Sequence, residues 1–195
     1  MKILLTAFDP FGGETENISQ QVLEALPDRV AGAELVKLLL PTVFRAAGER
    51  ALEAAERIRP DAVLSLGQAA GRRALTPERV AVNLMDARIP DNAGFQPMDE
   101  PVVPGGPAAY FSTLPVKAMV RAMEAAGAPA QLSLSAGTFV CNSLMYTLLH
   151  WAALSAPEIR CGFLHLPLPA DLERNAALRG LEAALEVLSG KLSAG

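Results

Sequence analysis

The sequence predicts an α/β protein, a single three-layer α/β/α sandwich with a mostly parallel central sheet. Two observations lead to this class. Short apolar runs typical of buried strands alternate with segments whose apolar residues recur every three or four positions. In addition, 195 residues with 51% hydrophobic and 19% charged side chains suffice for one well-formed core. We therefore expect one domain over residues 1–195, since two domains would each be small.

The first half of the chain is predicted to run strand, helix, strand, helix, strand. The apolar run at 3–7 is followed by Asp9-Pro10, and those at 35–40 and 62–66 end at Pro41 and Gly67. Between the first two runs, Asn17 is a favourable N-cap for a helix with the apolar face Ile18, Val22, Leu23 and Leu26. A helix over about 43–58 has a solvent-facing side formed by Arg45, Glu49, Arg50, Glu53 and Glu56.

The second half continues the alternation. Ser112-Thr113 and Pro115 begin a helix carrying Val116, Met119, Val120 and Met123. A short strand is expected at 132–134, a helix from 139 to about 154, and a strand at 162–166. The last expected helix starts at Asp171 and carries Leu178, Leu181, Leu185, Leu188 and Leu192. Strands that alternate with helices of this length predict parallel pairing.

One stretch departs from the pattern. Residues 84–111 contain five prolines and three glycines, and a loop of that length is uncommon inside a compact domain. Such a segment is a lid, a binding loop or a partner contact, or else an ordered surface excursion that covers a sheet edge. The sequence alone leaves these alternatives open.

Composition excludes several classes of function. A net charge of −4 without a basic run argues against a nucleic-acid surface, and two cysteines cannot form a disulfide scaffold. Neither Cys-x-x-Cys nor a close pair of histidines occurs, so a protein-built zinc site is not expected. Gly12-Gly13 fits neither glycine-rich nucleotide motif, and no cofactor is expected. The apolar run at 3–7 is too short for a signal or membrane segment, which predicts a soluble, cytoplasmic protein.

The two cysteines and two histidines allow four pairings. Cys141 and His150 lie nine residues apart on one expected helix, about 13.5 Å along it and on opposite sides. Cys161 and His165 lie about 13 Å apart on one strand. A pair of Cys161 with His150 would stand away from the rim where open α/β sheets bind ligands. Cys141 with His165 is the remaining pair, since both follow or end strands at that rim.

The surroundings of these two residues suit nucleophilic catalysis. Cys141 falls in the first turn of its helix, where free N–H groups and the helix dipole favour a thiolate and could hold an oxyanion. Glu78, in Thr76-Pro77-Glu78, is a candidate to orient His165. Each residue also has an ordinary structural interpretation: an inert core cysteine, a core histidine bonded to a carbonyl, and a solvated carboxylate.

Several ordered blocks of the chain resemble the pyroglutamyl peptidase I family of cytosolic cysteine peptidases. The blocks cover residues 6–13, 66–69, 76–81, 88–92, 136–142 and 162–167, so the likeness extends over nearly the whole chain. The most specific block is Ala136-Gly137-Thr138-Phe139-Val140-Cys141-Asn142. The resemblance implies a single α/β/α domain that removes an N-terminal pyroglutamyl residue from peptides without a cofactor. It also implies a homo-oligomer, with a tetramer favoured over a dimer.

The resemblance also assigns roles to residues. Cys141 would be the nucleophile, His165 the general base and acid, and Glu78 the residue that orients the imidazole. Arg88 stands where the family has an arginine near the oxyanion. The remaining substrate-binding positions implied around the lactam ring are Phe8, Phe11, Asn17, Gln68, Ile89, Phe139 and Val140.

Two other classes of function compete with this one. A binding module could use the same fold with Cys141 merely buried. A nucleoside phosphorylase could share a related architecture, but it needs phosphate-binding arginines at glycine-rich turns, and only Arg72-Arg73 after Gly71 is available.

Overall fold

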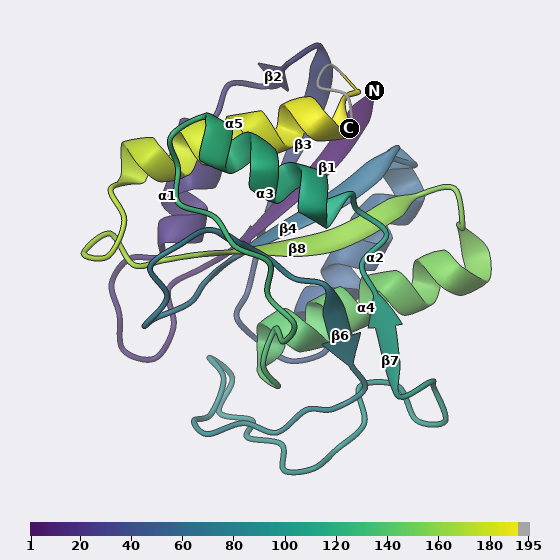
Figure 1. Ribbon diagram of the computed structural model, residues 1–195. Helices are drawn as coiled ribbons and strands as arrows, with labels where there is room; N and C mark the ends of the chain where they lie inside the picture. The colour runs from purple at the N-terminus through teal and green to yellow at the C-terminus, as the bar shows by residue number, and fades with distance from the viewer. Residues whose placement is uncertain (191–195) are drawn as a thin grey trace.

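A six-stranded mixed sheet forms the centre of the protein in our computed structural model, which describes residues 1–190 (Figure 1). Its strand order is β2-β3-β1-β4-β8-β5. The four inner strands are parallel: β3 (Ala33–Leu40), β1 (Lys2–Phe8), β4 (Ala62–Gln68) and β8 (Arg160–Leu166). The edge strands β2 (Arg29–Val30) and β5 (Thr76–Pro77) run antiparallel to their neighbours.

Helices cover both faces of this sheet and complete the three layers (Figure 1). One face carries α1 (Ile18–Ala25), α3 (Val116–Ala125) and α5 (Arg174–Leu188). The other carries α2 (Ala46–Ile58) and α4 (Val140–Ser155). The sheet therefore separates two apolar clusters, and the predicted α/β/α sandwich with a mostly parallel sheet is confirmed.

The alternation of side chains along the inner strands decides which of them face helices α2 and α4. Along β8, Cys161 and Phe163 belong to the cluster under α2 and α4, whereas Leu164 and Leu166 belong to the opposite cluster. His165 follows the same alternation and faces the α4 side. Gly67 of β4 is its register partner in the neighbouring parallel strand.

Most predicted elements form close to their expected positions, and the differences have local causes. Asn17 caps α1 as predicted, its side chain accepting a hydrogen bond from the Ser19 N–H. Helices α2 and α5 begin three residues later than predicted, and Leu192 lies outside the described residues. Strands β2 and β5 were not expected, because two-residue strands carry no periodicity.

The strand predicted at 132–134 is wrong. This segment makes two isolated bridges instead, from Ala130 to Leu75 and from Ser133 to Glu78. Gln131 donates to the Leu75 carbonyl and Ser133 to the Pro77 carbonyl, so the segment follows the outer side of β5 without a regular ladder. Leu134 is 70% exposed, which shows why the apolar run does not behave as a buried strand.

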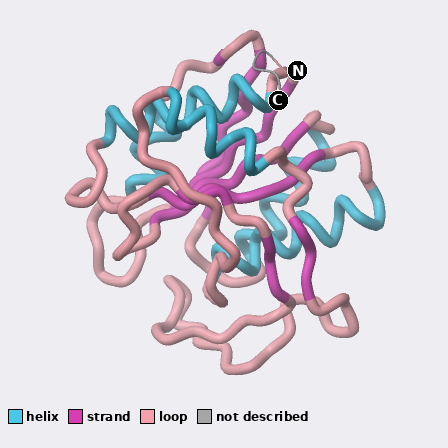
Figure 2. Tube along the Cα trace, in the orientation of Figure 1, coloured by secondary structure: helices cyan, strands magenta, loops and turns pink. Residues whose placement is uncertain are grey.

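The proline-rich segment leaves the body between β6 (Val80–Val82) and β7 (Ala109–Phe111), which pair with each other in a second, two-stranded sheet (Figure 2). Its start is anchored by Asn142 of α4, whose side chain bonds to the backbone of Val82 and Leu84. Part of the segment packs against the apolar cluster under α2 and α4, through Phe95, Val102 and Val103. No helix within residues 1–190 is long and apolar enough to cross a membrane.

Candidate active site

Cys141 is the second residue of α4 and lies at the carboxyl end of the parallel strands. The N-cap position is occupied by Phe139, whose side chain makes no capping hydrogen bond, so the first N–H groups of the helix are not capped from there. The sulfur lies against β4: a Cβ atom built on Gly67 would be 3.0 Å from Cys141 Sγ. Only glycine at this position leaves room for the thiol.

His165 lies beside Gly67 in the adjacent strand and points to the same face of the sheet. Its side chain is buried, and its ring packs on Phe163 with centroids 4.7 Å apart. Cys141 and His165 both line one cavity, so the pairing that the sequence favoured brings the thiol and the imidazole to one place.

Glu78 follows the antiparallel edge strand β5, which turns its carboxylate toward β8. Its Oε1 lies 2.7 Å from Nδ1 of His165, and its backbone N–H donates to the Phe163 carbonyl at 2.9 Å. The carboxylate is fully buried, and its second oxygen, Oε2, has no hydrogen-bond partner among the described residues. Because Nδ1 faces Glu78, the imidazole keeps Nε2 for chemistry in the cavity.

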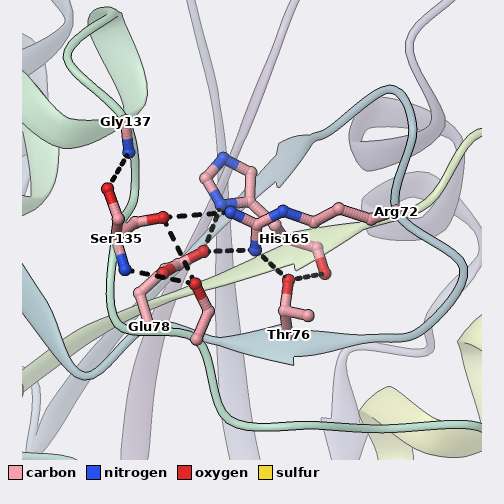
Figure 3. Close-up of polar contacts among 7 residues, drawn as sticks. Arg72, Thr76, Glu78, Ser135, Gly137 and His165 are labelled. Atoms are coloured by element: carbon pink, nitrogen blue, oxygen red, sulfur yellow. Dashed lines mark hydrogen bonds and ion pairs between the residues drawn. The ribbon is translucent and has the colours of Figure 1, made fainter.

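Arg72 approaches the same carboxylate from the turn after β4 (Figure 3). Its Nη1 lies 2.5 Å from Glu78 Oε1, and it also donates to the hydroxyl of Thr76. Its Nη2 donates to the Ser135 carbonyl at 3.0 Å. One guanidinium therefore connects β5 with the segment that leads into α4.

Burial sets the protonation states of the resting site. Desolvation raises the pKa of the Cys141 thiol to about 12; the Glu78 charge also raises it, and Arg72 opposes both. Desolvation lowers the pKa of His165 below its ordinary value, although Glu78 acts in the other direction. Burial therefore acts against the thiolate that the helix N-terminus is predicted to favour.

The cavity has a volume of about 640 Å³. Its aromatic wall contains Phe11 and Phe139, whose ring centroids are 5.9 Å apart. Its charged groups are Arg72, Asp86 and Arg88. The other lining residues are Gln68, Ala69, Ala70, Ile89, Ser135, Ala136, Gly137, Thr138, Cys141 and His165.

Five of the eight substrate-binding residues expected from the family resemblance line this cavity: Phe11, Gln68, Arg88, Ile89 and Phe139. The other three lie behind the wall. Phe8 is a core residue packed on Phe163, with centroids 6.4 Å apart, and Val140 is fully buried at the start of α4. Asn17 is buried at the start of α1, where its Nδ2 donates to the Asp9 carbonyl.

Asn17 is nevertheless connected to the cavity through its neighbour. The Ile18 N–H in the first turn of α1 donates to Oε1 of Gln68 at 3.1 Å, so the helix that Asn17 caps holds the Gln68 amide. Sequence reasoning gave no site role to Asp86 or Arg72. The one available signal for Arg72 was its place just after Gly71, which was considered only as a phosphate site.

The other cysteine and histidine lie elsewhere. Cys161 is fully buried in β8, and its thiol pKa is raised to about 12 by burial. His150 bonds to the Tyr110 hydroxyl at 2.9 Å beside β7. Within residues 1–190, no group of three His, Cys, Asp or Glu side chains is placed to hold a metal ion.

Comparison with known proteins decides the family, since residues 1–186 match the pyroglutamyl peptidase family. The chain belongs to the pyroglutamyl peptidase family. The pyrrolidone-carboxylate peptidase of Levilactobacillus brevis is 50% identical over 198 residues, covering 96% of this chain and 97% of that protein. The enzyme of the same name from Streptococcus pyogenes serotype M4 is 49% identical, with 95% of this chain and 91% of that protein covered.

Solved structures of this family have the same fold. Pyroglutamyl peptidase I from Bacillus amyloliquefaciens superposes with a TM-score of 0.91 at 42% identity, covering 97% of both chains. A mutant pyrrolidone carboxyl peptidase from Pyrococcus furiosus gives a TM-score of 0.93 at 38% identity, covering 98% of this chain and all of that one. The protein is therefore a peptidase of the pyroglutamyl peptidase family.

Proposed function

We propose that this pyroglutamyl peptidase removes an N-terminal pyroglutamyl residue from peptides by nucleophilic attack of Cys141, with His165 as general base and acid and Glu78 as the residue that orients it. The observation that carries the proposal is the convergence of the three side chains: Glu78 contacts His165 at 2.7 Å, and His165 shares one cavity with Cys141. This is the arrangement of nucleophile, base and orienting carboxylate that acyl transfer needs.

The proposed reaction starts from the neutral pair. Nε2 of His165 takes the thiol proton as Sγ attacks the pyroglutamyl carbonyl, and the free N–H groups at the start of α4 hold the oxyanion. The imidazolium, stabilised by Glu78, then gives its proton to the leaving amine, and a thioester remains on Cys141. A water molecule that loses a proton to His165 hydrolyses the thioester, which releases pyroglutamate and restores the thiol.

Recognition of the lactam ring is assigned to Phe11, Phe139 and Gln68, which line the same cavity as the thiol. Phe11 and Phe139 supply flat apolar surfaces for a five-membered ring. Oε1 of Gln68 already accepts the Ile18 N–H, so its amide nitrogen is left as a donor for the lactam carbonyl. A proline ring would leave such polar groups unpaired, which is the physical basis for rejecting prolyl peptides.

The proposed function also includes expectations about the domain, the assembly, the cofactor and the cellular compartment. The whole chain acts as one catalytic domain, as a homo-oligomer that is a tetramer rather than a dimer, and without a cofactor. A reducing compartment such as the cytoplasm suits a catalytic thiol, and both Cys141 and Cys161 are free.

The deciding experiment measures release of a chromogenic amine from its pyroglutamyl derivative, with the prolyl derivative as the control substrate. Cys141→Ser should abolish the activity, whereas Cys161→Ser, buried away from the cavity, should keep most of it. Iodoacetamide should inactivate the wild type with one modified cysteine. An active Cys141→Ser variant would exclude the proposed nucleophile, and equal rates on both substrates would exclude the proposed specificity.

A further inference from the structure

Arg72 holds a position that peptide hydrolysis by Cys141, His165 and Glu78 does not account for. It comes from the turn after β4, and its side chain is 24% exposed where it reaches the fully buried Glu78. One nitrogen binds the carboxylate, and the other binds the Ser135 carbonyl (Figure 3). Two parts of the site that are far apart in sequence are thus joined by one planar cation.

The electrostatics of Glu78 require such a cation. A fully buried carboxylate is stable only when it is paired and hydrogen-bonded, and burial lowers the pKa of His165, which weakens the imidazole as a charged partner. Oε2 has no hydrogen-bond partner among the described residues, so the compensation rests on Oε1. Among the ion pairs of Glu78 within residues 1–190, the one with Arg72 does not depend on protonation of a histidine.

The contact between Arg72 and Ser135 lies close to Cys141 along the chain. Ser135 stands six residues before Cys141, and its hydroxyl accepts the Gly137 N–H at 3.2 Å. Ser133, two residues earlier, forms a bridge with Glu78, and its hydroxyl donates to the Ser135 carbonyl at 3.2 Å. The segment before α4 is therefore fixed to the strand that carries Glu78 by backbone bonds and by Arg72.

We propose that Arg72 is a positioning residue for the hydrolysis: its guanidinium keeps the Glu78 carboxylate aligned on His165 and fixes the segment that delivers Cys141. The inference rests on the proposed catalytic roles of these three residues. Arginine suits this task because its planar fork reaches two oxygens with a permanent charge, whereas lysine offers a point charge.

The charge of Arg72 also acts on the two groups that exchange the proton. The groups that face His165 are Glu78 after β5, Arg72 after β4 and Cys141 on α4, with Asp86 and Arg88 on the same cavity wall. Arg72 lowers the pKa of His165, which keeps the base unprotonated, and lowers the pKa of the thiol. Removing the cation should therefore raise both pKa values.

The test compares Arg72→Met and Arg72→Lys with the wild type, with Arg73→Met as the matched control because Arg73 is the exposed next residue. Arg72→Met should lower kcat by about 10–100-fold with KM within about twofold. The acid limb of its kcat/KM profile and the pH profile of iodoacetamide labelling at Cys141 should both move to higher pH. Arg72→Lys should keep the acid limb of kcat/KM and the labelling profile near their wild-type positions but recover only part of kcat. Arg73→Met should have the wild-type kcat and the wild-type pH profiles.

The controls separate this inference from the function on which it rests. If Cys141→Ser or His165→Ala remains active, the proposed mechanism fails before Arg72 is considered. The positioning role is wrong if those variants are inactive while Arg72→Met keeps the wild-type kcat. It is also wrong if Arg72→Met leaves the pH profiles of kcat/KM and of iodoacetamide labelling unchanged. If Arg72→Met does not fold, Arg72→Lys decides: wild-type kcat for the lysine variant would overturn the need for the two-oxygen contact.

Discussion

The thiol of Cys141 lies against the backbone of Gly67, at a point where a Cβ atom would stand 3.0 Å from Sγ. Gly67 is in turn the register partner of His165 in the neighbouring strand. The absence of a side chain at Gly67 of β4 therefore provides the space for the sulfur of Cys141, in the cavity that His165 of β8 also lines.

Gly67→Ala should therefore reduce catalysis. The added methyl group would lie 2.7 Å from Phe163 Cζ and 3.0 Å from Cys141 Sγ, which forces the ring under His165 and the thiol to move. We expect kcat/KM to fall at least about tenfold, with a stability loss of about 1–3 kcal/mol from overpacking. Steady-state kinetics and urea unfolding measure the two effects separately.

Gly162→Ala is the matched control for this variant. Its added methyl group would clash with Ser112 and Leu114, away from the thiol, at 2.5 and 2.6 Å. It should lose comparable stability and keep kcat in the folded fraction. Equal kinetic losses in the two glycine variants would show that general overpacking, rather than the position of the thiol, limits the reaction.

Stability should fall in acid because His165 is buried as the neutral imidazole. Its pKa is lowered in the folded state, so between the ordinary value of 6.5 and the folded value the unfolded chain binds a proton that the native protein does not. The free energy of unfolding should therefore decrease as the pH falls below about 6.5. Thermal unfolding between pH 5 and pH 7 measures this slope.

His165→Gln should have a shallower slope over the same range. Because the comparison uses the melting temperature, it does not depend on the catalytic assay. A wild-type slope in the His165→Gln protein would mean that other groups cause the acid sensitivity.

Phe11→Ala should damage recognition while the fold survives. Phe11 lines the cavity against Phe139 and is partly exposed. Its truncation should leave a folded enzyme with at least about tenfold lower kcat/KM, equivalent to about 1.4 kcal/mol. Binding of free pyroglutamate should weaken, and discrimination against the prolyl substrate should relax.

Phe8→Ala is the contrasting variant, because Phe8 is 2% exposed and packs on Phe163 in the core. It should cost about 3–5 kcal/mol of stability. Calorimetry together with titration of pyroglutamate tests the contrast. An unchanged substrate preference in Phe11→Ala would remove that residue from the ring pocket.

Assembly should depend on the exposed apolar side chains of the proline-rich segment 84–111. Met98 is 81% exposed and Phe111 66% exposed, which is a liability on a monomer. We expect light scattering at micromolar concentration to show an oligomer, and Phe111→Glu to shift it to smaller species with little change in kcat per subunit. A monomeric, fully active wild type would exclude this assembly.

The sequence by itself determined the layers of the protein and indicated the pair of residues, Cys141 and His165, that lines its cavity. Apolar runs and three-to-four spacing act locally, so they located the four inner strands and the five helices of residues 1–190 within a few residues. Open α/β sheets bind ligands at the carboxyl ends of their parallel strands, which all lie on one side of the sheet. This rule left Cys141 and His165 as the cysteine–histidine pair that could meet at a site.

Only the tertiary structure decided what surrounds that pair. Glu78 reaches His165 because a two-residue strand pairs antiparallel at the sheet edge, and so short a strand has no periodicity to detect. Arg72 and Ser135 meet across 63 positions of the sequence, and neither has a local pattern that announces the contact. The pKa of the Cys141 thiol also depends on the tertiary structure, because desolvation, the largest cause of its rise, depends on every atom packed around the sulfur.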